Sequence, residues 1–206
     1  MNTPKFLNFN ANPFGTRDAG DCMTRALVAG TRYGYKTIVD LLKPKYFDGI
    51  GAEGVTLREI QDFAARTGYI HDFDYEWKKN WRVTQRDIDN LVKYGDFSMR
   101  FWLEHLTKQD AGGSNIIFLM KLKPDEAIPD GNTLRYHAVW GNVTTKEYTD
   151  LQDTLDMIVY YMFVVDPSKM CPKDDPRYFT TEAERMRAEH RKAIAAELVK
   201  MRSKKK

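Results

Sequence analysis

Cys22 is the residue whose type and position most clearly suggest chemistry. It lies in the stretch Gly20-Asp21-Cys22-Met23-Thr24-Arg25-Ala26-Leu27, where a loop bounded by glycine runs into a segment with the composition of an apolar helix. A cysteine reacts as its thiolate, and the partial positive charge of a helix N-terminus stabilises that anion. The pattern predicts a nucleophile at residue 22. The alternative is a buried cysteine that packs as a small apolar side chain.

A nucleophilic thiol needs a general base beside it and a further group that orients the base. Of the four histidines, His137 is the best placed, because it begins an apolar stretch with the composition of a strand, and a strand holds an imidazole rigidly. Asp150 follows thirteen residues later. A short turn between them would bring a second strand back beside His137, so that Asp150 accepts a hydrogen bond from the imidazole. Asp153 and Asn142 are alternatives for this third role.

Each of these two predictions has a plainer alternative. A histidine in an apolar strand is also found as a core residue whose ring nitrogens bind the backbone. An aspartate near a turn is often an exposed turn residue. Asp21 and Arg25, four positions apart on the expected first helical turn, are suited to form a helix ion pair.

The order of these parts resembles that of the papain-like cysteine peptidases. The closer resemblance is to their small bacterial and phage branch, in which the nucleophile lies in a Gly-Asp-Cys-x-x-Arg-Ala motif, present here at residues 20–26. That branch also has a histidine followed by an apolar strand and then a Tyr-Asp pair. His137-Ala138-Val139-Trp140 and Tyr148-Thr149-Asp150 are similar to these, with Thr149 as an extra residue. The likeness in layout covers roughly residues 12–165.

The resemblance implies that Cys22 is the nucleophile, His137 the base and acid, and Asp150 the orienting group. It implies a thiol-dependent hydrolase that cleaves peptide or isopeptide bonds of a protein or peptide substrate, without a cofactor or a metal. Acyl transfer would use the same residues. It further suggests a phage or bacterial origin, and therefore the bacterial host cytoplasm or a virion as the location.

One departure from the family pattern concerns the oxyanion. Papain-like enzymes usually carry a Gln six residues before the cysteine, and here that position is Thr16, with no Gln anywhere before Cys22. Asn10 or Asn12 would substitute only if the N-terminal arm folds back. Loss of one oxyanion donor costs about a hundred- to a thousandfold in other hydrolases. This favours the alternative function, a catalytically inactive papain-like structural or interaction protein such as a phage virion component.

The expected elements come in two groups, helices first and strands afterwards, which predicts an α+β domain whose C-terminal antiparallel sheet carries the histidine. Capping boxes at Thr56/Glu59 and Thr181/Glu184 mark two helix starts, and Thr84 with Asp87 can open another helix. We expect helices at about 22–33, 35–42, 57–67, 85–94 and 97–106, and strands at about 115–122, 135–143 and 156–165.

The chain divides by composition into three segments. We predict a papain-like domain over residues 1–166 with a helical insertion at about 71–111, a Pro-rich linker over 167–180, and a basic C-terminal helix over 181–206. The aromatic residues of the insertion are expected to form its core, with a partner-binding surface as the alternative.

Composition bounds the function further. Of 206 residues, 42% are hydrophobic, as in a globular protein. The N-terminus lacks the pattern of a signal peptide, and the longest apolar run, residues 157–165, is too short to cross a membrane as a helix. Two cysteines and four scattered histidines give no metal-ligand spacing.

Positive charge is concentrated at the C-terminal end. Residues 180–206 hold nine of the 32 Lys/Arg and four of the 29 Asp/Glu, so the other residues carry a slight negative excess. The body is therefore not built to coat nucleic acid. Contact with nucleic acid is expected only through the basic tail, and the C-terminal helix is a candidate anchor for a protein partner.

Overall fold

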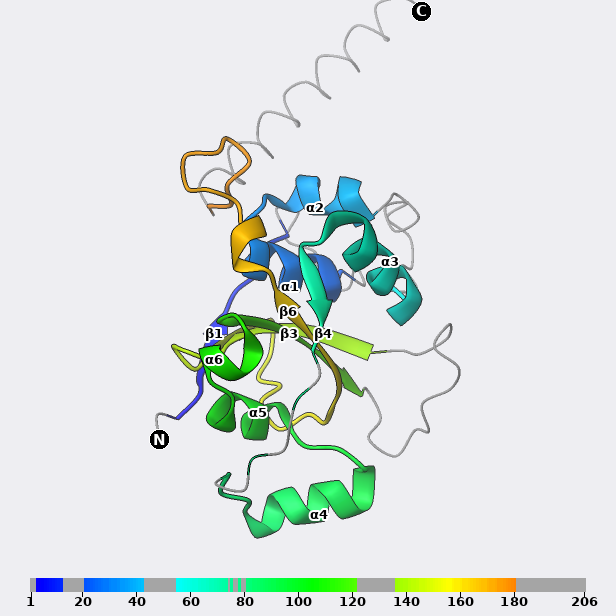
Figure 1. The fold of residues 1–206 in the computed structure, drawn as a ribbon, viewed down its shortest axis with the longest axis vertical. Coiled ribbons are helices and arrows are strands. Elements are labelled where there is room, and N and C mark those ends of the chain that lie inside the picture. The colour runs from blue at the N-terminus through cyan, green and yellow to red at the C-terminus, as the bar shows by residue number, and fades with distance from the viewer. Residues whose placement is uncertain are drawn as a thin grey trace, which may run out of the picture.

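The computed structural model describes residues 3–12, 21–42, 55–73, 75, 78, 81–121 and 136–180. The protein has a mixed α+β architecture, in which one sheet lies between two layers of helices (Figure 1). Within the described ranges, no helix is both long enough and apolar enough to cross a membrane.

The sheet has six strands in the order β1-β5-β4-β3-β6-β2. Their bounds are β1 Lys5–Asn8, β2 Ile70–Asp72, β3 Asn115–Lys121, β4 Tyr136–Asn142, β5 Glu147–Asp150 and β6 Val159–Val165. The central strand β3 is buried along its whole length because helices cover both faces of the sheet. All neighbouring strands run antiparallel except β1 and β5, which are parallel. The prediction of an antiparallel sheet is therefore wrong at this edge, and the sheet is mixed.

The described residues form six helices. Their bounds are α1 Cys22–Thr31, α2 Tyr35–Leu42, α3 Leu57–Thr67, α4 Gln85–Tyr94, α5 Met99–His105 and α6 Lys108–Ala111. Helices α1, α2 and α3 lie on one side of the sheet, and α4 and α5 lie on the other (Figure 1).

Each face of the sheet has its own hydrophobic cluster. The cluster on the α1 side joins α1, α2 and α3 to alternate residues of the strands, among them Ile117 and Trp140. The cluster on the α5 side uses the intervening residues, such as Phe118 and Val139, together with Phe101 and other predicted aromatics of the insertion. The expectation that these aromatics form a core is confirmed for Phe97, Phe101 and Trp102.

Local sequence signals placed several helix ends correctly. Thr56 with Glu59 and Thr84 with Asp87 both form reciprocal capping boxes, at the starts of α3 and α4. Gly68 and Gly95 end these helices with positive φ angles of 62° and 77°, the left-handed conformation that glycine adopts without strain. These signals lie within a few residues of one another and do not depend on the rest of the fold.

Residues 167–180, where the proline content predicts a linker, pack on the C-terminal end of α1. The segment begins with a 3-10 turn, η2 (Pro167–Lys169). Cys171 and Phe179 are buried in the α1-side cluster, and Tyr178 forms a β-bridge with Tyr33.

Parts of the sequence predictions fall outside the described residues. These are Gly20 of the motif, Thr16, and the whole basic helix predicted over 181–206.

Candidate active site

Helix α1 places Cys22 at its first position. Asp21 is the N-cap residue, but its carboxylate makes no hydrogen bond to the first-turn N–H groups. It accepts instead from Arg25 Nε at 3.0 Å, from Asn12 Nδ2 at 2.9 Å and from the Tyr35 hydroxyl at 2.6 Å. Asp21 therefore does not cap the first-turn N–H groups beside Cys22. A helix end of this kind favours negative charge, on a thiolate or on a substrate.

Strands β4 and β5 bring His137 and Asp150 together. The two strands pair antiparallel, so residues thirteen positions apart in sequence become neighbours. His137 Nε2 donates to Asp150 Oδ2 at 2.5 Å. At its other end Asp150 is fixed by the backbone, because Leu151 N–H donates to its Oδ1 at 2.7 Å. The hydrogen bond predicted between these two side chains is present.

Strand β1 supports the end of β5 that carries Asp150. Asn8 is in register with Asp150 in the parallel pair, and Phe9 N–H donates to the Asp150 carbonyl at 3.1 Å. Residues 5–8 of the N-terminal arm are therefore a strand that supports the site.

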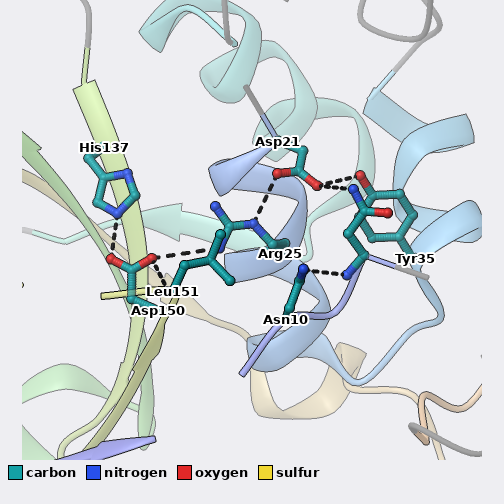
Figure 2. Close-up of polar contacts among 8 residues, drawn as sticks. Asn10, Asp21, Arg25, Tyr35, His137, Asp150 and Leu151 are labelled. Carbon is teal, nitrogen blue, oxygen red and sulfur yellow. Dashed lines mark hydrogen bonds and ion pairs between the residues drawn. The ribbon is translucent and has the colours of Figure 1, made fainter. Parts of the chain in front are cut away.

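Arg25 links the helix to the strand. Its guanidinium lies 3.0 Å from Asp21 Oδ1 and 3.6 Å from Asp150 Oδ1. Figure 2 shows the resulting chain of polar contacts from Tyr35 through Asp21, Arg25 and Asp150 to His137. Tyr35, Asp21, Arg25 and Asp150 are each at most 8% exposed. Buried charges are stable only when paired and hydrogen-bonded, and here each carboxylate faces the same cation.

The electrostatics of the site favour a charged imidazole. Burial by itself lowers the pKa of His137, but hydrogen bonds with Asp150 and Cys22, and the negative charge of both, raise it from 6.5 to about 9. Burial raises the pKa of Asp150, yet the hydrogen bond from His137 and the charge of Arg25 lower it below its ordinary value. Around neutral pH the pair is therefore an imidazolium and a carboxylate.

The position of Cys22 completes this arrangement. Its side chain is partly exposed, and it is one of the groups that raise the pKa of His137. Because Nε2 is occupied by Asp150, Nδ1 is the ring atom left for the thiol. A positively charged imidazole beside an uncapped helix N-terminus is the environment that stabilises a thiolate.

The alternative residues for the third role lie elsewhere. Asp153 accepts from the Tyr148 hydroxyl at 2.6 Å and from Leu155 N–H at 3.0 Å. The Asn142 side chain donates to Asn115 Oδ1 at 3.1 Å. Neither of these contacts involves His137.

The two other described histidines have surroundings of a different kind. His105 bonds the backbone carbonyls of Phe101 and Arg82 through its two ring nitrogens, and His71 is exposed on β2.

The contacts of Asn12 and Tyr35 with Asp21 were not predicted from the sequence. The N-terminal arm does fold back, but the Asn12 amide donates to Asp21. Tyr35 was expected only as the start of a helix, and its hydroxyl contact with Asp21 spans fourteen residues. Nothing in the spacing of these residues indicates the contact, because it depends on how α2 packs against α1. The Asp21–Arg25 pair, by contrast, has the expected i,i+4 spacing.

The described part of the chain contains no group of three or more His, Cys, Asp or Glu side chains arranged to hold a metal ion. Comparison of the chain with protein-family models, with curated proteins and with solved structures gave no match. The chemistry of the site is therefore argued from its own geometry.

Proposed function

We propose that this protein is a thiol-dependent hydrolase that cleaves peptide or isopeptide bonds with a papain-like arrangement of Cys22, His137 and Asp150. The proposal rests on one observation, which is that the His137 imidazole interacts with both Asp150 and Cys22. His137 binds Asp150 at 2.5 Å through Nε2 and interacts with Cys22 at the start of α1. A nucleophile, a base and an orienting group in this order are the parts that acyl transfer needs.

The reaction follows from the roles of the three side chains. The Cys22 thiolate attacks the carbonyl carbon, and the electron pair of the C=O π bond moves to the oxygen. When the intermediate collapses, the C=O bond re-forms and the C–N bond breaks. The amine takes its proton from the His137 imidazolium. Water, deprotonated by His137, then attacks the thioester and releases the acid and the thiol.

Two features of the site support this proposal over a plain structural cysteine. Asp21 turns its carboxylate away from the first-turn N–H groups, which leaves them available beside Cys22. Arg25 and Asp150 form a buried ion pair that holds the strand bearing Asp150 against α1. A cysteine that only filled space would need neither feature. A phage or bacterial source remains part of the same proposal.

The test is the rate of alkylation by iodoacetamide at pH 7, followed separately for Cys22 and Cys171 by mass spectrometry. An unperturbed thiol is only about 3% thiolate at this pH, so Cys22 in a thiolate–imidazolium pair is expected to react up to about thirtyfold faster than an ordinary cysteine. His137→Ala should remove this advantage. His71→Ala, which changes an exposed histidine on β2, is the matched control and should leave the rate unchanged.

The competing function is a non-enzymatic interaction protein that keeps the same fold. It predicts that Cys22 and Cys171 are both alkylated slowly, and that His137→Ala has no effect on Cys22. That result would contradict the hydrolase.

A further inference from the structure

Strand β6 contains an irregularity close to the candidate site. Leu119 of β3 is paired with Tyr161, whereas the next residue, Met120, is paired with Val159. Tyr160 is therefore an extra residue without a counterpart on β3, which is a β-bulge. Bulges of this kind redirect a side chain, and they occur often beside active sites.

The bulge changes which face of the sheet Tyr160 occupies. Tyr160 and Tyr161 are consecutive, yet both pack against the cluster on the α1 side. The flanking residues Val159 and Met162 belong to the cluster on the opposite side. In a regular strand, adjacent side chains point to opposite faces. The bulge thus brings an additional phenol to the face that carries α1 and Cys22.

The hydroxyl of Tyr160 is buried and has no hydrogen-bond partner among the described residues. Buried polar groups in proteins are almost always hydrogen-bonded, so an exception suggests a missing ligand. Burial and the nearby negative charge of Cys22 raise the pKa of Tyr160, so the phenol keeps its proton and acts as a donor.

Two observations relate Tyr160 to β4, the strand that carries His137. The Tyr160 ring lies 6.4 Å from the ring of Tyr136, the residue that precedes His137. Met120 is paired with His137 on one side and with Val159 on the other, so the bulge lies level with His137 along the sheet, with β3 between β4 and β6.

We propose that the Tyr160 hydroxyl donates a hydrogen bond to the oxyanion that forms when Cys22 attacks a carbonyl. The proposal rests on the proposed function and adds a catalytic residue to it. When the C=O π bond opens, its electron pair becomes the negative charge on oxygen, and the Tyr160 O–H binds that oxygen without giving up its proton. Tyr160 then supplies the donor that the Gln expected at position 16 would supply. Of the two asparagines considered for this role, Asn12 donates its amide to Asp21, and the side-chain oxygen of Asn10 accepts from Asn12 N–H.

The experiment compares two reactions of Cys22 in the full-length protein. Acylation by p-nitrophenyl acetate forms an oxyanion, whereas alkylation by iodoacetamide displaces iodide at a saturated carbon and forms none. In Tyr160→Phe, the acylation rate should fall by about a hundredfold or more, the usual loss for one oxyanion donor, while the alkylation rate stays the same. Tyr161→Phe removes a hydroxyl that contacts Gln61 and is the matched control, with both rates expected to match wild type.

Stability provides a second measurement. Since the described structure offers Tyr160 Oη no partner, its removal should not lower the melting temperature, whereas loss of a structural hydrogen bond would lower it. Equal acylation of Tyr160→Phe and wild type would overturn the proposal, and so would a parallel loss of alkylation. If wild-type Cys22 itself is alkylated no faster than an ordinary thiol, the proposed function fails and not only the role of Tyr160.

Discussion

The two ends of helix α1 are built in opposite ways. At the C-terminal end, the carbonyl groups that the helix leaves without a partner are taken up by the chain segment packed on it. Cys171 N–H donates to Thr31 O at 2.8 Å, and Phe179 N–H donates to Arg32 O at 2.7 Å. At the N-terminal end, the residue in the capping position turns its carboxylate away from the first-turn N–H groups. One end is closed by backbone hydrogen bonds, and the other keeps its donors unused by a capping side chain.

The two cysteines of the chain fall on these two ends. Cys171, at the negative end of the helix dipole, is 4% exposed, whereas Cys22, at the positive end, is partly exposed and beside His137. A thiolate is favoured at the positive end and disfavoured at the other. Under the proposed function, the helix end and the charged neighbour of Cys22 distinguish a reactive cysteine from a structural one. A structural cysteine such as Cys171 is recognised by its burial and packing alone.

The largest effect on the free energy of unfolding is expected from loss of the buried ion pairs at the N-terminal end of α1. Arg25→Met leaves Asp21 and Asp150 as buried carboxylates without their common cation. Loss of one partner of a buried pair should lower the free energy of unfolding by about 3–5 kcal/mol, measured by urea denaturation at pH 7. The matched control is Lys36→Met, which breaks the Lys36–Asp40 pair of the same i,i+4 spacing on α2, where the side chains are 61% and 58% exposed.

The control should change stability by at most about 0.5 kcal/mol, because exposed pairs contribute little. If Arg25→Met is no more damaging than Lys36→Met, the N-terminal end of α1 is not held by charge, and the contrast between its two ends disappears.

The next effect is a dependence of stability on pH. The pKa of His137 is raised from 6.5 to about 9 in the folded protein, so its contribution is fully present below pH 6.5 and is lost as the pH rises through 9. A shift of this size corresponds to about 3 kcal/mol. The pKa of Asp150 is lowered from 3.8, so its contribution is present above pH 3.8 and is lost as the pH falls through the lowered value.

The measurement is the difference in the free energy of unfolding between wild type and His137→Ala, at pH 6 and at pH 10. The difference should be large at pH 6 and small at pH 10. A difference for His137→Ala that is constant with pH would show that no ion pair forms at the start of α1.

The contrast also shows which features a sequence can predict. The capping box of Thr56 and Glu59 and the Asp21–Arg25 pair were predictable because their residues are three and four positions apart on one helix. The contact between His137 and Asp150 was predictable because two strands joined by a short connection usually pair antiparallel, which brings these residues close together. Their catalytic role stays a prediction.

Features that depend on tertiary packing were not found. The four residues of β1 carry no clear strand pattern, and they form a strand because β5 offers a free edge next to Asp150. The bulge at Tyr160 depends on the register of β6 against β3, which neither strand shows by itself. The contact of Tyr35 with Asp21 depends on the angle between α1 and α2. In each case the partner lies too far along the chain for a local signal.

The smallest effect is expected at the C-terminal end of α1, where packing and not charge determines stability. A Cβ added at Gly30 would lie 2.8 Å from Val165 Cγ2 and 3.2 Å from Trp140 Cδ1. Alanine is a better helix former than glycine by about 1 kcal/mol, but β-branched Val165 and the buried ring of Trp140 have little room to move. Overpacking of this kind costs about 1–3 kcal/mol, so Gly30→Ala should lower stability by about 1 kcal/mol overall and the melting temperature by about 2–4 °C.

A double-mutant cycle with Val165→Ala tests the cause, because the added methyl group should then fit and Gly30→Ala should become stabilising. A loss in Gly30→Ala that is unchanged by Val165→Ala would mean that close approach to β6 does not explain this glycine. The C-terminal end of α1 would then lack the packing constraint that distinguishes it from the charged N-terminal end.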